Sequence, residues 1–176
     1  MNSRFYIFAF LSISFLTMLW LASLSGDLTR VSAESGVAIS AAKREEAYRA
    51  NNLGVAQLEQ YNHKAGADEF KRALEIDPQL KIAQINLAIA LFNAQDLDGA
   101  LQAANLAAAN SPAGLQPQYI LGLIAKSQNR TDDAVNAFTK VLQADREDVG
   151  ANVNLGQIYI QQRKYAEAVN IFRVKK

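Results

Sequence analysis

The chain repeats itself with a period of 34 residues. One column of the repeat is a leucine followed by glycine or alanine, at Leu53-Gly54, Leu87-Ala88, Leu121-Gly122 and Leu155-Gly156. Further columns hold an aromatic residue or alanine (Phe70, Ala104, Phe138 and Phe172) and a small residue (Gly66, Ala100, Ala134 and Ala168). Two prolines, Pro78 and Pro112, keep the same interval. Columns that stay in phase over four copies predict one structural unit stacked repeatedly along the chain.

Each unit is predicted to be a pair of helices. In the second unit, residues 81–94 place Ile82, Ile85 and Ile89 three and four residues apart, which is the spacing of one helix face. Residues 98–110 have the same type of spacing and form the second helix of the pair. The two prolines each end a second helix, because proline lacks the N–H group and disfavours helix in the residue before it.

The turn inside each pair is expected to carry a helix cap. Asp96 lies between the two helices of the second unit, and its carboxylate can accept from the next helix. Asn62 and Thr131 are predicted to do the same in the first and third units. The column of glycine and alanine is expected to let the paired helix come close, with Phe70 and Phe138 filling the space beside it.

These columns resemble those of the tetratricopeptide repeat, which has Leu-Gly, alanine, an aromatic residue, alanine and proline at this spacing. The resemblance covers residues 47–176 as the repeats 47–80, 81–114 and 115–148, followed by an incomplete repeat, 149–176. It implies an all-α fold, an α-α superhelix of about three and a half repeats. Some positions depart from the family: Ala50, Gln84, Gln118 and Asn152 replace a large residue, Ala104 replaces the aromatic residue, and Arg146 replaces proline.

A long apolar segment precedes the repeats. Residues 5–24 contain no charged side chain, and as a helix they would rise about 30 Å, the thickness of a bilayer core. We expect residues 1–25 to be one apolar helix, either a signal peptide or a transmembrane anchor, followed by a linker and helical cap over residues 26–46. An uncleaved segment would anchor the array on the non-cytoplasmic side of a membrane. The small residues at 31 and 33 resemble a cleavage site, so a secreted or periplasmic chain is the alternative.

Composition argues against several classes of chemistry. The chain has 18 basic and 17 acidic residues, so it has no positive field for a nucleic acid. It has no cysteine and one histidine, His63, which argues against thiol catalysis and against a metal site of several imidazoles. No glycine-rich phosphate loop or nucleophile motif occurs. The sequence therefore predicts a protein that is not an enzyme, holds no cofactor or metal and binds no nucleic acid.

The resemblance implies that the first helices of the repeats line a concave groove that accepts a peptide or a helix of a partner protein. The residues expected there are Asn51, Val55, Leu58, Ile82, Ile85, Ile89, Phe92, Tyr119, Leu123, Lys126, Val153, Gln157 and Ile160. This set is mostly apolar, so the expected partner is an apolar or helical protein segment. In an alternative interpretation, residues 82–92 are core residues packed between repeats.

Some members of the family hold a terminal carboxylate with basic residues of the groove. The corresponding columns here contain Asn51, Gln116 and Ile120, and only Asn86 matches, so a carboxylate clamp of that kind is not expected.

The incomplete last repeat suggests a second function. Val169 and Phe172 are expected to be partly uncovered, because nothing in the sequence supplies a helix to pack on them. The chain is then either a scaffold that self-associates through this repeat, or the recruiting or oligomerising N-terminal part of a longer exported protein whose activity lies downstream of residue 176.

Overall fold

The computed structural model describes residues 39–173, and the predicted apolar segment over residues 5–24 lies outside this range. The described residues form helices joined by short turns, without a β-strand. The helices are α2 (Ala41–Glu59), α3 (His63–Ile76), α4 (Lys81–Asn93), α5 (Leu97–Asn110), α6 (Leu115–Ser127), α7 (Thr131–Ala144), α8 (Val149–Gln161) and α9 (Tyr165–Phe172). The predicted all-α fold is confirmed.

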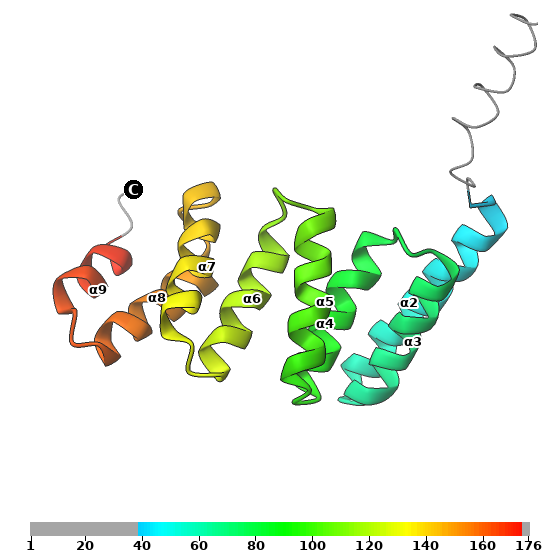
Figure 1. The fold of residues 1–176 in the computed structure, drawn as a ribbon, viewed down its shortest axis with the longest axis horizontal. Coiled ribbons are helices and arrows are strands. Elements are labelled where there is room, and N and C mark those ends of the chain that lie inside the picture. The colour runs from blue at the N-terminus through cyan, green and yellow to red at the C-terminus, as the bar shows by residue number, and fades with distance from the viewer. Residues whose placement is uncertain (1–38, 174–176) are drawn as a thin grey trace, which may run out of the picture. The chain divides into compact units, whose positions relative to one another are not determined.

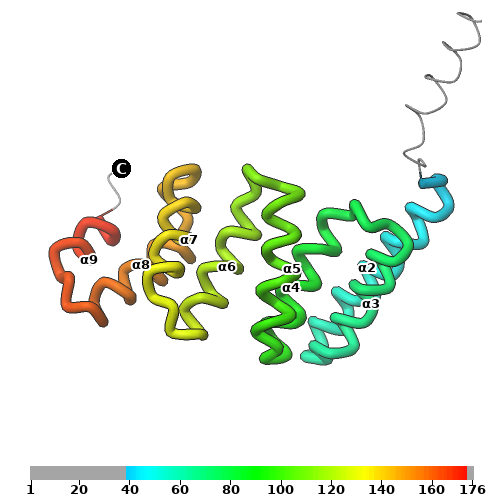
Figure 2. The backbone as a smooth tube through the Cα atoms, viewed as in Figure 1, coloured from blue at the N-terminus to red at the C-terminus, as the bar shows by residue number. Residues whose placement is uncertain are grey.

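The helices form consecutive pairs, and each pair lies next to the pair that follows it in sequence (Figure 1). Each helix packs on the next one from α2 to α9. The first helices α4, α6 and α8 begin 34 residues apart and have 13 residues each. The tube in Figure 2 shows the same succession of helix and turn in every pair. The predicted stacking of helix pairs is therefore confirmed.

The first helices lie on the inner side of the array. Neighbouring first helices pack directly on each other in the pairs α2–α4 and α4–α6. The second helices of the described repeats, α3, α5, α7 and α9, make no comparable contact with one another. An array in which one row of helices is closer together than the other curves toward the closer row. The surface formed by the first helices is therefore the concave one.

The column of small residues sets the distance between the two helices of a repeat. A Cβ atom added at Gly54 would lie 2.6 Å from Cε1 of Phe70, and one added at Gly122 would lie 2.7 Å from Cε1 of Phe138. Both rings are fully buried. Since a real Cβ contact is never that short, the ring occupies the space that a side chain would need. The predicted role of this column is confirmed in the first and third repeats.

The second repeat solves the same packing problem with two alanines. Ala88 replaces the glycine and Ala104 replaces the phenylalanine, and both are fully buried. The departure from the family at Ala104 is accompanied by a larger residue on the facing helix, and both alanines belong to one buried cluster, although one added methyl group does not replace the volume of a phenylalanine ring.

A left-handed residue ends the first helix of every repeat. Tyr61, Gln95, Asn129 and Arg163 have φ angles of 61°, 64°, 56° and 59°, and they are 34 residues apart. In the second repeat the next residue, Asp96, donates its backbone N–H to the carbonyl of Leu91 at 3.0 Å. This is the hydrogen bond of a Schellman motif, which closes a helix through a left-handed residue.

The predicted caps have three different outcomes. Asp96 caps α5 as expected, since its Oδ1 accepts from the backbone N–H of Gly99 at 3.0 Å. Asn62 occupies the cap position of α3, but its Nδ2 donates to Oε1 of Gln57 instead. The cap prediction for Thr131 is wrong, because Arg130 precedes α7 and Thr131 is its first residue. The 34-residue interval from Asp96 leads to Arg130, whose side chain makes no capping bond.

Two polar departures from the family are hydrogen-bonded inside the array. Gln84 is buried, donates to the carbonyl of Pro78 at 2.7 Å, and accepts from Asn110 at 3.1 Å. Asn152 is buried too and donates to the carbonyls of Arg146 and Asp148, both at 2.9 Å. Buried amides with such partners do not carry the penalty of unsatisfied groups. They connect the start of a first helix to the end of the preceding repeat.

We predict that Gly122→Ala lowers the free energy of unfolding, although alanine favours helix over glycine by about 1 kcal/mol. The new Cβ would press on the Phe138 ring, and overpacking of a filled core costs about 1–3 kcal/mol. In a Phe138→Leu background, Gly122→Ala should lower the free energy of unfolding by less, or raise it. Urea denaturation of the four chains measures the coupling, and additive effects would contradict the role assigned to this contact.

Candidate protein-binding surface

The first helices carry four columns of side chains at 34-residue intervals, which we call the first-helix face. In chain order within each column they are Tyr48, Ile82, Gln116 and Gly150; Asn51, Ile85, Tyr119 and Val153; Val55, Ile89, Leu123 and Gln157; Leu58, Phe92, Lys126 and Ile160. The thirteen residues predicted to line the groove all belong to these columns. Tyr48, Gln116 and Gly150 were not predicted, although the 34-residue interval from Ile82 leads to each of them.

Seven of the thirteen predicted residues pack against the core. Half-buried apolar side chains of α2 and α4 pack against the cluster that contains Phe70 and Leu91. They are Val55, Leu58, Ile85, Ile89 and Phe92. Tyr119 and Leu123 pack in the same way against the cluster that contains Phe138. The interpretation of residues 82–92 as core therefore describes part of α4, whose apolar residues surround the whole helix.

Other apolar residues of the face are open to solvent. Ile82 is 44% exposed, Val153 39% and Ile160 47%, and Tyr48 is exposed as well. Gln157 is also exposed, as the polar member of its column. Exposed β-branched residues on a concave surface give a partner an apolar area to bury.

A cavity of about 360 Å³ opens between α4, α6 and the start of α8. Its walls are formed by Ile89, Leu115, Gln116, Tyr119, Ile120, Asp148 and Gly150. The Tyr119 ring lies over Gly150, where an added Cβ would be 2.8 Å from Cε2 of the ring. The absence of a side chain at Gly150 thus lets Tyr119 form one wall. This cavity is large enough and apolar enough to take a side chain of a partner.

Asn51 belongs to a contact between repeats rather than to the open surface. It is 4% exposed, and its Oδ1 accepts from Nδ2 of Asn86 at 3.0 Å. The pair joins α2 to α4, so a ligand would reach Asn51 only by breaking this bond. Asn86 is therefore engaged within the array.

A polar network joins α6 to α8 at the other end of the face. The ammonium of Lys126 donates to Oδ1 of Asn154 at 2.7 Å and to Oε1 of Gln157 at 2.9 Å. Nδ2 of Asn154 donates in turn to the carbonyl of Gly150 at 2.9 Å and to the hydroxyl of Tyr119 at 3.3 Å. Asn154 was not predicted, and the residue type alone gave no signal, because Asn52 and Asn86 occupy the same column.

Other kinds of site have little support within residues 39–173. No group of three or more acidic or histidine side chains there is arranged to hold a metal ion. His63 begins α3 and lies edge-on to the Tyr61 ring, with 6.2 Å between the ring centroids. No helix from α2 to α9 is both long and apolar enough to cross a membrane.

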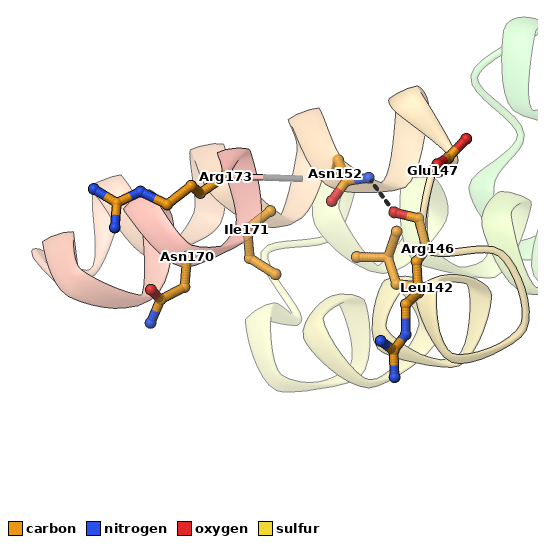
Figure 3. A pocket seen from close by; sticks show the side chains of 7 residues that line it. All are labelled: Leu142, Arg146, Glu147, Asn152, Asn170, Ile171 and Arg173. Atoms are coloured by element: carbon orange, nitrogen blue, oxygen red, sulfur yellow. Dashed lines mark hydrogen bonds between the residues drawn. The ribbon is translucent and has the colours of Figure 1, made fainter. Parts of the chain in front are cut away.

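A second surface lies at the last described repeat. A cleft of about 620 Å³ separates α9 from α7 and the start of α8, and Leu142 and Ile171 point toward it (Figure 3). The polar residues around it are Arg146, Glu147, Asn152, Asn170 and Arg173.

Two apolar side chains of α9 are partly open to solvent, although the Phe172 ring packs over Gly156 of α8. Val169 is 51% and Phe172 48% exposed, whereas the corresponding Val135 and Phe138 of α7 are half-buried and fully buried. The difference arises because α8 packs on α7, while no helix in the described part of the chain follows α9.

Comparison with known proteins identifies the repeat. Two family models described as tetratricopeptide repeat match residues 52–114 and 125–174. No curated protein sequence matches the chain.

Solved structures share the fold at low sequence identity. A crystal structure of MamA is 22% identical, with a TM-score of 0.68 over 72% of this chain and 74% of that one. MamA from Desulfovibrio magneticus RS-1 is 19% identical, with a TM-score of 0.66 over 72% and 71%. The first such domain of Spaghetti (RPAP3), bound to the HSP90 peptide SRMEEVD, is 19% identical, with a TM-score of 0.66 over 73% and 99%.

Proposed function

Since this chain is built from tetratricopeptide repeats, we propose that it is a non-catalytic scaffold that binds an apolar protein segment on its first-helix face. The observation that carries the proposal is the exposure of Ile82, Val153 and Ile160 on the concave side, next to an apolar cavity. A segment laid along this side would bury these residues together, and burial of apolar area is the main favourable term in such association.

The expected ligand differs from the acidic peptide bound to the RPAP3 domain. The columns that would hold a terminal carboxylate contain Asn51, Asn86, Gln116 and Ile120, and the two asparagines bond to each other. The four columns of the first-helix face contain one charged residue, Lys126. Apolar contacts are therefore expected to contribute most of the affinity.

We predict that Ile82→Asp weakens the binding of selected peptides by about tenfold or more, because the loss of an apolar contact worth about 1.5–3 kcal/mol is joined by the burial of a charge. The peptides would be selected by phage display on the full chain in lipid nanodiscs, and affinities measured by biolayer interferometry. Leu106→Asp is the matched control, since Leu106 is 52% exposed but lies on the second helix α5. Equal losses in both variants would exclude the first-helix face.

The partial exposure of Val169 and Phe172 on α9 supports a second candidate function, self-association, which would also suit the recruiting part of a longer protein. A second copy that covers Val169 and Phe172 would bury apolar surface on α9, as α8 does for the corresponding residues of α7.

The absence of cysteine from the sequence gives a direct test of self-association. Val169→Cys places a single thiol on α9, and we predict that oxidation of vesicles containing this chain yields a disulfide-linked dimer on non-reducing gels. Leu106→Cys is the matched control, with 52% exposure against 51% at Val169. If neither cysteine variant forms the dimer, or if both form it to the same extent, the α9 interface is contradicted.

We also propose that residues 5–24 anchor the array to a membrane, on the non-cytoplasmic side. The support is the length and the uncharged character of this stretch in the sequence.

We predict that Ile13→Arg combined with Leu16→Arg releases the chain from membranes, since each central arginine costs about 2.5–3.5 kcal/mol of insertion free energy. Carbonate extraction followed by immunoblotting measures the release. Thr29→Arg, outside the apolar stretch, serves as the control and should stay in the pellet. A shortened wild-type chain in the soluble fraction would contradict the anchor and support cleavage.

A further inference from the structure

We propose that the partner segment carries a carboxylate that pairs with the ammonium of Lys126, on the same segment as an apolar side chain that fills the cavity beside Tyr119. The inference rests on the proposed function and specifies the partner's chemistry. Lys126 lies outside the columns in which members of the family hold a terminal carboxylate.

The first argument comes from the repeat itself. The column of Lys126 otherwise contains Leu58, Phe92 and Ile160, and the column of Gln157 contains Val55, Ile89 and Leu123. Packing of neighbouring repeats therefore does not need a charged or amide side chain at either place. The two polar residues occur in successive repeats and touch each other, with 2.9 Å between the Lys126 ammonium and Oε1 of Gln157. Two substitutions that meet in space indicate a local requirement rather than drift at single positions.

The second argument is the incomplete neutralisation of Lys126. Its two hydrogen-bond partners, Asn154 and Gln157, are neutral amides. Within residues 39–173 no carboxylate lies within 4.0 Å of this ammonium. A lysine has three N–H donors, so one remains for another acceptor. The amides hold the ammonium in place on the concave surface, and its charge stays uncompensated.

The consequence for a partner follows from desolvation. Any segment that covers the first-helix face removes water from Lys126, and burial of an unpaired charge is costly. A carboxylate on the segment would offset the desolvation of the ammonium by a charge-assisted hydrogen bond, whereas a purely apolar segment would leave the charge unpaired. At the other end of the face, Asp148 lies on the wall of the cavity with its Oδ1 accepting from the backbone of Ala151. Asp148 disfavours a carboxylate there, so the two charges set the direction of the segment.

The geometry of α6 fixes the spacing. Tyr119, on the wall of the cavity, and Lys126 are seven residues apart on one helix, which corresponds to a rise of about 10 Å. The apolar anchor and the carboxylate of the partner are therefore separated by about seven residues in a helical segment or about three in an extended one. Other arrangements place the carboxylate against apolar residues of the face.

The test uses peptides selected by phage display on the full chain in nanodiscs, made synthetically with each acidic residue present or changed to glutamine. We expect the selected peptides to share an apolar residue and an Asp or Glu at one of these spacings. Removing the carboxylate should weaken binding to the wild-type chain by about tenfold, measured by fluorescence anisotropy, with a smaller difference at high salt.

The chain variant Lys126→Met should bind the acidic and neutral peptides equally, whereas the matched control Lys140→Met, on the second helix α7, should keep the tenfold preference. Methionine suits a column whose other members are apolar. Apolar peptides selected without an acidic residue, or a Glu→Gln exchange without effect on the wild-type chain, would overturn the Lys126 pairing and leave the scaffold function intact. Failure to select any apolar peptide would overturn both. The peptide exchange needs no change in the chain, so the test does not depend on the folding of Lys126→Met.

Discussion

The array depends on the close approach of the two helices within each repeat. A glycine beneath a phenylalanine ring fixes this distance in the first and third repeats, and Ala88 facing Ala104 fixes it in the second. A Cβ at either glycine would sit within 3 Å of the ring, so a repeat with phenylalanine at this contact has no room for a side chain at the facing position. Once each pair has a set separation, neighbouring pairs can stack at a constant angle. That regular stacking brings the first helices together on one side.

The concave surface is a consequence of this stacking and of the composition of the first helices. Helix α4 contacts its own partner α5, the preceding second helix α3 and the first helices α2 and α6, and it has apolar residues on every side. Part of that apolar surface stays open, as Ile82 shows. The same residues that stabilise the array therefore also form the surface a partner would use. Substitutions at half-buried positions such as Ile85 and Phe92 would disturb both properties, whereas Ile82 separates them.

The sequence was sufficient for the helix pairs because period, apolar spacing and proline positions all agree. It was insufficient for the turns. The left-handed position is occupied by tyrosine, glutamine, asparagine and arginine, which share no chemistry, so only the 34-residue interval marks it. Threonine is a good capping residue, but the cap position of α7 is Arg130, 34 residues after Asp96, and Thr131 is the first residue of the helix. The Schellman motif forms backbone hydrogen bonds at the end of the first helix with any of these side chains, so side-chain preference does not determine the turn.

The candidate surface was predictable in position and not in detail, for a physical reason. The helix period predicts which residues of a first helix share one face, and the 34-residue interval joins the thirteen predicted residues into four columns. That these columns bind a partner stays a prediction. Whether a side chain is bonded within the array or exposed to a ligand depends on contacts between repeats, as the hydrogen bond between Asn51 and Asn86 shows. The repeats themselves supply a reference for interpreting these contacts. A residue that matches its column, such as Phe92, is explained by packing against the core, whereas Lys126 and Gln157 depart from their columns together and meet across α6 and α8. Two contacting residues that both differ from the apolar residues of their columns are not needed for stacking, and we therefore assign them to ligand binding.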